Sequence, residues 1–211
     1  MVVKIEKPMS RVFNYSLDWR FLLPSADAGK IRVVLEEDTD LSEALERVGI
    51  PVANQFSFSD INQNERNSAE SLVIPFGLPV RWVGPKQEDQ IEFYRSIQRL
   101  IGPSGYLLMG FNNSWDFRSK TQSNYHSSTP RRVAYQLKQA GFKSIKIFGA
   151  IPNLSIPEYI FDLNVQAIRF ALSQRLRRKP AALNFLQVLS RTIGLAGISN
   201  FLPCYFAVAA S

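Results

Sequence analysis

The chain has 211 residues, 45% of them hydrophobic and 20% charged, which is the balance of an ordinary globular protein. This length suits one well-buried domain and is short for two, so we expect a single domain over 1–211. One cysteine excludes a disulfide within the chain, and no spacing of ligand residues indicates a metal site. The charged N-terminus does not read as a signal peptide, and no window has the roughly 20 apolar residues of a membrane span, so we expect a cytoplasmic protein.

The net charge of +7 is concentrated towards the C-terminus. No acidic residue follows Asp162, whereas the segment beyond it carries Arg169, Arg175, Arg177, Arg178, Lys179 and Arg191. We predict a basic amphipathic helical segment over 163–193, broken at Pro180. Such a surface is compatible with an anionic membrane or a lipid-linked substrate over 169–191, and nucleic acid is less expected. The alternatives are a solvated helix face, or helices that cover the sheet and support a homodimer.

The first half of the chain predicts a strand, a helix and a second strand. The sequence IRVVLE, Ile31 to Glu36, has almost no alternation, which is typical of a buried parallel strand. Asp40 can begin the next helix, and Gly49 is a natural stop. We predict a second strand over 50–56 and a polar loop over 59–70.

The second half continues this alternation of strands and helices. A second polar loop is predicted over 112–128, and Thr129 and Pro130 are suited to begin the helix that follows it. The further predicted elements are strand 71–77, helix 88–101, strand 106–111, a helix ending at Gly141, strand 142–151 and strand 204–210. The order predicts an α/β fold with a mostly parallel central sheet and helices on both faces.

Four stretches resemble class I S-adenosylmethionine-dependent methyltransferases. SIQRLIGPSGYLLMGFNN (96–113) and YQLKQAGFKSIKIFGAIPN (135–153) resemble two successive helix–strand units of that family. SLDWRFLLP (16–24) and NFLPCYFAVAA (200–210) resemble the lead-in and the final antiparallel strand of a branch associated with polysaccharide and glycan biosynthesis. The resemblance implies a Rossmann-like, class I methyltransferase-like fold in a truncated form.

The resemblance also implies where a cofactor would lie, at the carboxyl ends of the first strands. A glycine-rich turn follows strand one in that family, and an acid that ends strand two holds the ribose hydroxyls. Here Glu36 matches the acid that ends strand one, but Glu37 and Asp38 fill a turn without glycine. Gln55 lies at the end of strand two, and Gly77 follows the next strand of the pocket.

These departures predict that ordinary cofactor binding is lost. Side chains in the turn keep the backbone from the ligand, and the carboxylates repel the carboxylate of the cofactor. Between Phe56 and Ser71 there is little room for the family's third strand and its helix. We therefore expect no cofactor, and a binding, scaffold or partner-regulating module in glycan or lipid-linked biosynthesis. The alternatives are an active O-methyltransferase that uses S-adenosylmethionine on a sugar or related hydroxyl, and an enzyme that uses the crevice for another ligand.

Five further residues are candidates for a site, each with a structural alternative. His126 is the only histidine, and it is either a general base or a surface residue. Trp82 and Trp115 follow predicted strands, where they stack on a ligand ring or pack in the rim. Arg131 and Arg132 at a helix start oppose the macrodipole, which makes a phosphate-binding or interface role the alternative to a solvated surface, the commoner case.

The basic segment gives a prediction that vesicle sedimentation tests. If Arg177, Arg178 and Lys179 hold the chain on an anionic membrane, it sediments with vesicles that contain phosphatidylglycerol and not with neutral ones. Replacing the three with glutamine lowers the bound fraction. Binding that does not depend on the anionic lipid would exclude the membrane as partner.

Overall fold

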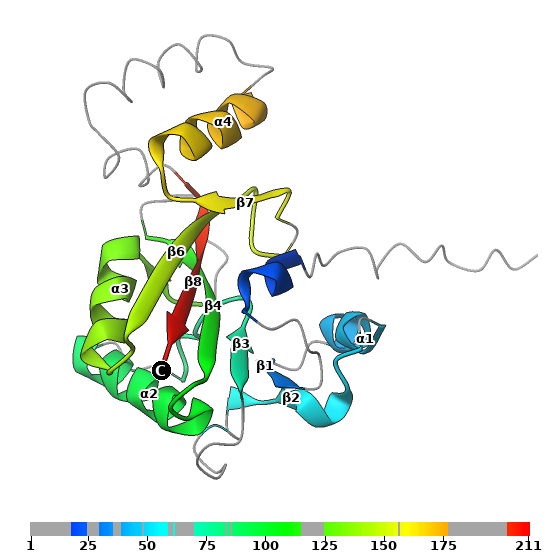
Figure 1. Cartoon of the computed structure of the whole chain (residues 1–211), viewed down its shortest axis with the longest axis vertical. Helices are drawn as coiled ribbons and strands as arrows, with labels where there is room; N and C mark the ends of the chain where they lie inside the picture. Colours follow the sequence, from blue (N-terminus) through cyan, green and yellow to red (C-terminus); the bar gives the residue numbers. More distant parts are fainter. Residues whose placement is uncertain are drawn as a thin grey trace, which may run out of the picture.

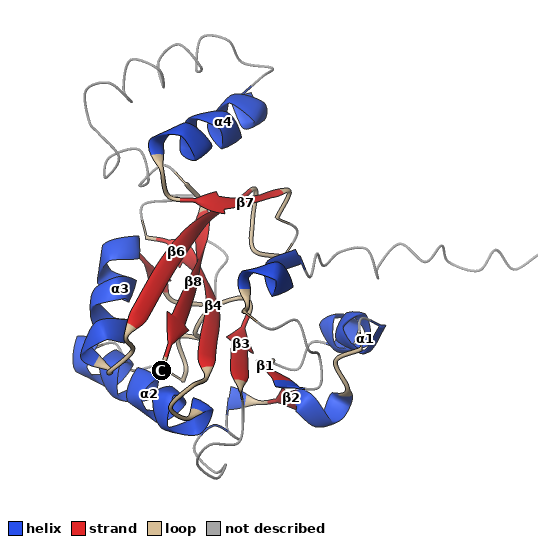
Figure 2. Cartoon of the chain, in the orientation of Figure 1, coloured by secondary structure: helices blue, strands red, loops and turns tan. Residues whose placement is uncertain are grey.

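One mixed sheet organises the chain, with strands in red and helices in blue in Figure 2. The computed structural model describes residues 18–24, 30–35, 39–47, 49–58, 61, 70–82, 84, 86–114, 125–155, 157–176 and 202–211. The strands are β1 (Ile31–Val34), β2 (Gln55–Phe56), β3 (Ser71–Ile74), β4 (Tyr106–Asn113), β5 (Ser127–Ser128), β6 (Ser144–Ile151), β7 (Tyr159–Asp162) and β8 (Cys204–Ala210). The helices are α1 (Thr39–Arg47), α2 (Gln87–Ile101), α3 (Pro130–Gln139) and α4 (Val165–Leu176), with 3₁₀ turns at Asp18–Leu22 and Val52–Asn54.

The strand order within the described residues is β2-β1-β3-β4-β8-β6-β7, with β5 paired to β4. The strands β2, β1, β3 and β4 are parallel, and their register pairs Val33 with Gln55 and Ser71 with Tyr106. The last strand, β8, is antiparallel to both β4 and β6. The carboxyl ends of β1, β3 and β4 therefore meet at one edge, which is where ligands bind in open α/β sheets.

Helices cover both faces of the sheet, as predicted (Figure 1). Successive residues of a strand point to opposite faces, and β4 shows the consequence. Leu107 packs in one hydrophobic cluster with Ile97 of α2 and Leu137 of α3, whereas Leu108 packs in the other with Leu45 of α1. The predicted fold class is confirmed, including the antiparallel final strand.

Local sequence signals account for the helix ends. The Thr129 side chain accepts a hydrogen bond from the backbone N–H of Arg132 at 3.3 Å, and Pro130 occupies the first turn of α3. Gly49, with a φ of 85°, follows α1 as predicted, since glycine tolerates this left-handed conformation. The helix itself begins at Thr39, one residue before the predicted cap at Asp40.

Several segments differ from the prediction: β3 ends at Ile74 and not at Gly77, and β7 was not predicted. The strand expected over 50–56 is mostly a 3₁₀ turn, in which the Asn54 N–H donates to the Pro51 carbonyl at 2.9 Å, and only Gln55–Phe56 pair with β1. Pro51 has no backbone N–H to donate to a neighbouring strand, which disfavours a strand at this position. The polar loop expected over 112–128 is shorter, because β4 runs to Asn113 and Ser127–Ser128 pair beside it.

Of the predicted segment 163–193, the structure describes a helix, α4, up to Leu176. Ile168 and Ala171 are buried against the sheet, while Phe170 is 56% exposed and packs edge-on against Tyr159. Residues 177–201 lie outside the described residues. Among the helices that are described, none is long and apolar enough to cross a membrane.

Candidate functional site

Among the described residues, side chains leave one small cavity near the carboxyl ends of β1 and β3, and residues 36–38, which connect β1 to α1, lie outside the described residues. The cavity left there is about 10 Å³. A small-molecule site usually needs about 300 Å³ or more. The residues that line this 10 Å³ cavity are Val34, Leu35, Leu41, Phe58, Ile74, Phe76, Gly77 and Tyr125. The described residues therefore leave space for about one water molecule at the switch point of the sheet.

Gly77 serves backbone packing in this region. Its φ is 93°, and a Cβ atom there would lie 2.9 Å from the carbonyl oxygen of Gly110. A Cβ atom on Gly110 in turn would lie 2.0 Å from the carbonyl oxygen of Pro75. The two glycines thus let the chain after β3 lie directly on β4, which is sufficient reason for glycine at position 77.

Trp82 supports the side chains that line this small cavity. Its ring stacks on Phe58 with a centroid separation of 6.5 Å, and Phe58 also contacts Phe93 of α2 at 6.3 Å. Phe58 is 3% exposed, whereas Trp82 is 40% exposed and carries the guanidinium of Arg81 at 5.8 Å from its ring. The tryptophan therefore covers Phe58 on one side and leaves part of its ring open to solvent.

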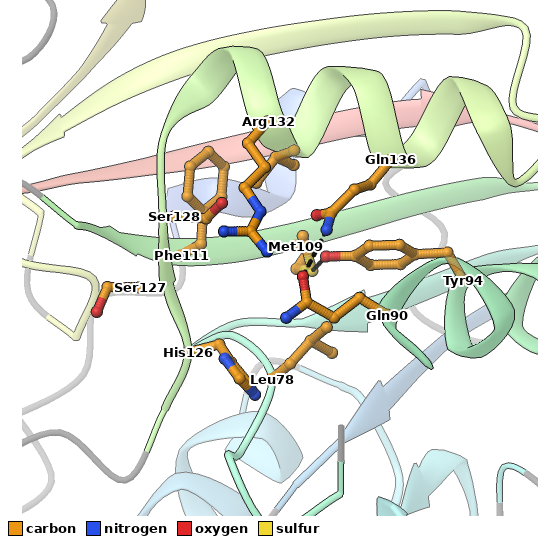
Figure 3. A pocket seen from close by; sticks show the side chains of 11 residues that line it. Leu78, Gln90, Tyr94, Met109, Phe111, His126, Ser127, Ser128, Arg132 and Gln136 are labelled. Carbon is orange, nitrogen blue, oxygen red and sulfur yellow. Dashed lines mark hydrogen bonds between the residues drawn. The ribbon is translucent and has the colours of Figure 1, made fainter. Parts of the chain in front are cut away.

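A larger cavity, of about 200 Å³, lies between α2 and α3 beside the carboxyl half of β4 (Figure 3). Apolar side chains of β4 and of the chain after β3 form its walls, and polar side chains come from the two helices and from the segment before α3. The lining residues are Leu78, Gln90, Tyr94, Met109, Phe111, His126, Ser127, Ser128, Arg132, Val133 and Gln136.

Two buried amides join the helices at this cavity. The Gln136 amide nitrogen donates a hydrogen bond to the Gln90 amide oxygen, and the two side chains are 1% and 9% exposed. This bond satisfies one group of each amide. The remaining NH₂ hydrogens of Gln90 and the oxygen of Gln136 have no further partner among the residues described. The only buried side-chain nitrogen or oxygen without a partner in the described structure is the Ser128 hydroxyl, so these free amide atoms are open to the cavity, where a polar ligand can reach them.

A tyrosine and an arginine lie next to the amides. The Tyr94 hydroxyl donates to the Met109 sulfur at 3.7 Å, a weak bond. Burial raises the pKa of Tyr94 well above its ordinary value, and the charge of Arg132 offsets part of this rise. In Figure 3 the Arg132 guanidinium points towards the two amides. Within the described part of the chain this guanidinium has no carboxylate partner.

The segment before α3 supplies the third side of the cavity. The backbone N–H of His126 donates to the Leu78 carbonyl at 2.7 Å, which holds the histidine beside the chain that follows β3. The Ser128 hydroxyl oxygen is buried and has no hydrogen-bond partner in the described structure. The cavity therefore combines a cation, an imidazole, two amides and hydroxyls with apolar walls.

The structure places the predicted site residues in different surroundings. His126 and Arg132 line the larger cavity, Arg131 is exposed on α3, and Gly77 lines the small cavity beside β1 and β3. The Gln55 amide accepts a hydrogen bond from the Ser42 hydroxyl, which ties β2 to α1. Outside the described residues lie Glu36, Glu37, Asp38, Trp115, Arg177, Arg178 and Lys179, and the Arg175 side chain is likewise not described.

Sequence reasoning missed Gln90, Tyr94 and Gln136 as site residues. A signal was present, because Gln136 lies between Val133 and Leu137 on the buried side of a helix. A glutamine at an inward position of an apolar stripe indicates a buried polar contact.

Comparison with known proteins shows likeness in structure alone. No family model matches the chain, and no curated protein matches it in sequence. A SAM-dependent methyltransferase from Archaeoglobus fulgidus superimposes with a TM-score of 0.53 at 13% identity, over 92% of this chain and 91% of that one. A SAM-dependent methyltransferase from Thermotoga maritima superimposes with a TM-score of 0.49 at 11% identity, over 95% of this chain and 87% of that one. One from Mesorhizobium loti superimposes with a TM-score of 0.46 at 12% identity, over 92% of this chain and 96% of that one.

The fold is thus a methyltransferase-like Rossmann fold, as the likeness to the Archaeoglobus fulgidus enzyme shows. The strand order and the antiparallel β8 agree with the resemblance noted in the sequence. Fold does not fix function, so the activity is argued from the sites.

The raised pKa of Tyr94 predicts a loss of stability at alkaline pH. Above the ordinary tyrosine pKa of 10.0 the unfolded chain loses its proton while the folded chain keeps it, so the free energy of unfolding falls as pH rises. Tyr94→Phe removes this term, worth about 1 kcal/mol at roughly pH 10.5. Urea titrations at that pH and at about pH 8 measure it. Tyr135→Phe, at an exposed position, is the control, and equal pH slopes for wild type and Tyr94→Phe would contradict the prediction.

Proposed function

We propose that this chain is a methyltransferase-fold protein that has lost ordinary S-adenosylmethionine binding and acts as a binding module. The small cavity beside β1 and β3 carries the proposal. An adenosyl ligand needs open space at the carboxyl ends of β1 and β3, and the cavity that the described residues leave there, with Phe58, Phe76 and Tyr125 in its lining, is about 10 Å³. Moving these side chains out would expose apolar surface, at a cost of about 2 kcal/mol for each large one.

The chemistry of the crevice supports the same conclusion. Only Leu35, Glu36, Glu37 and Asp38 connect β1 to α1, and none is a glycine that would let backbone approach a ligand. Gln55 at the end of β2 is neutral and engaged with Ser42, so it does not replace the acid that holds ribose hydroxyls in the resembling family. At about 1 kcal/mol for each lost hydrogen bond, several such losses reduce affinity to the millimolar range.

The module's role is that of a scaffold or partner regulator, and the resemblance of 16–24 and 200–210 suggests glycan or lipid-linked biosynthesis. The basic residues after Asp162 support an anionic partner. The exposed Phe170, packed on Tyr159, adds apolar surface on α4 at the start of that segment. A membrane surface or a second protein chain could contact both the basic residues and the exposed Phe170.

A second candidate is an O-methyltransferase with a rebuilt pocket. His126 supports it, because the histidine lines a cavity beside the carboxyl half of β4, where a general base would meet a hydroxyl substrate. This alternative requires cofactor binding, which separates it from the first proposal.

Titration with S-adenosylmethionine and S-adenosylhomocysteine distinguishes the two. We expect no saturable heat in calorimetry and no rise in Tm with either compound up to about 1 mM, since ligand binding to the folded state alone would raise Tm. Adenosine in the same series tests the base and ribose alone. One-to-one binding at micromolar concentration would overturn the proposal and favour the methyltransferase.

A further inference from the structure

The cavity between α2 and α3 has the composition of a ligand site of its own. It lies among Gln90, Tyr94, Arg132 and Gln136, whereas the small cavity beside β1 and β3 lies among Leu35, Phe58 and Phe76. Its volume of about 200 Å³ equals that of six or seven liquid waters at roughly 30 Å³ each. This is space for one ring and its substituents, and less than a drug-sized ligand requires.

The amide pair defines the neutral part of the ligand. With Gln136 donating to Gln90, the pair retains one donor group on Gln90 and one acceptor on Gln136. Turning both amides over reverses the bond but again leaves one donor and one acceptor. A group that offers a carbonyl next to an N–H satisfies both at once, and cyclic amides such as pyrimidine bases have this edge.

Arg132 defines the charged part. Arg132 is an exposed residue that lines the cavity, and its guanidinium points towards the amides in Figure 3, so its positive charge lies at the open side of the cavity. No carboxylate lines this cavity among the residues that the structure describes. A guanidinium binds phosphate or carboxylate through paired hydrogen bonds, so the ligand carries an anion.

The walls define the shape. Leu78, Met109 and Phe111 present apolar surface on the side of the sheet, and aromatic and thioether groups favour contact with a flat ring. The buried, unpartnered hydroxyl of Ser128 offers one further hydrogen bond at the edge before α3.

We propose that this cavity binds the planar cyclic amide of a small molecule that also carries an anionic group, as a pyrimidine nucleoside monophosphate does, with the ring inside the cavity and the rest of the molecule at its open side. The ring's donor–acceptor edge meets Gln90 and Gln136, and the anion meets Arg132. The proposal deepens the binding role proposed above, and it does not depend on whether the crevice binds S-adenosylmethionine.

Calorimetry on the full chain with uridine 5′-monophosphate tests it. We expect saturable one-to-one binding, weaker binding of uridine by about tenfold because the charged contact is lost, and no measurable binding of glucose 1-phosphate or inorganic phosphate. No binding of uridine 5′-monophosphate up to about 5 mM, well above typical metabolite affinities, would overturn the proposal. Equal binding of glucose 1-phosphate would overturn the amide recognition.

Two matched pairs of variants assign the contacts. Arg132→Ala lowers the affinity for uridine 5′-monophosphate by about tenfold and leaves that for uridine unchanged, whereas Arg131→Ala, one residue away and exposed, changes neither. The double variant Gln90→Leu/Gln136→Leu weakens both ligands, whereas the exposed Gln139→Leu has no effect. Replacing both amides together avoids leaving one buried and unpaired, so the fold is retained, and near-UV circular dichroism checks this. Unchanged affinity in Arg132→Ala or in the double variant would contradict the assignment.

The two proposals fail on separate readouts. Binding of S-adenosylmethionine at micromolar concentration would end the lost-cofactor proposal and leave the nucleotide result intact. Failure of uridine 5′-monophosphate with silent S-adenosylmethionine would end only the ligand assignment of the α2–α3 cavity.

Discussion

The packing of the buried Phe58 and the half-buried Phe76 and Tyr125 at the carboxyl ends of β1 and β3 limits the space at this edge of the sheet. Phe58 is 3% exposed and packs between Trp82 and Phe93, so it joins the sheet edge to α2 and to the turn after β3. Phe76 and Tyr125 complete the filling. Burial of such side chains stabilises the domain, and under the proposed function it leaves too little space for an adenosyl ligand at this edge.

The cavity with polar side chains in its lining lies between α2 and α3. Close packing of the backbone at Gly77 and Gly110 brings the chain after β3 onto β4, and Leu78 and His126 follow from this placement. The same packing closes the crevice on one side and shapes the larger cavity on the other. The described residues thus hold a cavity of about 10 Å³ beside β1 and β3 and a larger one of about 200 Å³ between α2 and α3, which Arg132, Gln90 and Gln136 line.

Much of the fold followed from local sequence. Thr129 and Pro130 identified the start of α3, and the apolar run CYFAVAA identified β8 at its observed bounds. The strand over 50–56 was wrong because a turn begun at Pro51 prevails over its apolar composition. The amide pair was not predictable, since helix periodicity shows which face is buried but not which residues meet across 46 positions of the chain. His126 and Arg132 were identified individually, and only the tertiary structure brings them to one cavity.

A crystal structure of the chain grown with saturating S-adenosylhomocysteine shows whether the strand ends accept an adenosyl ligand. We expect Phe58, Phe76 and Tyr125 to stay packed at the carboxyl ends of β1 and β3, with no adenosyl density there. Clear ligand density in that crevice, with the aromatic side chains displaced, would contradict this expectation.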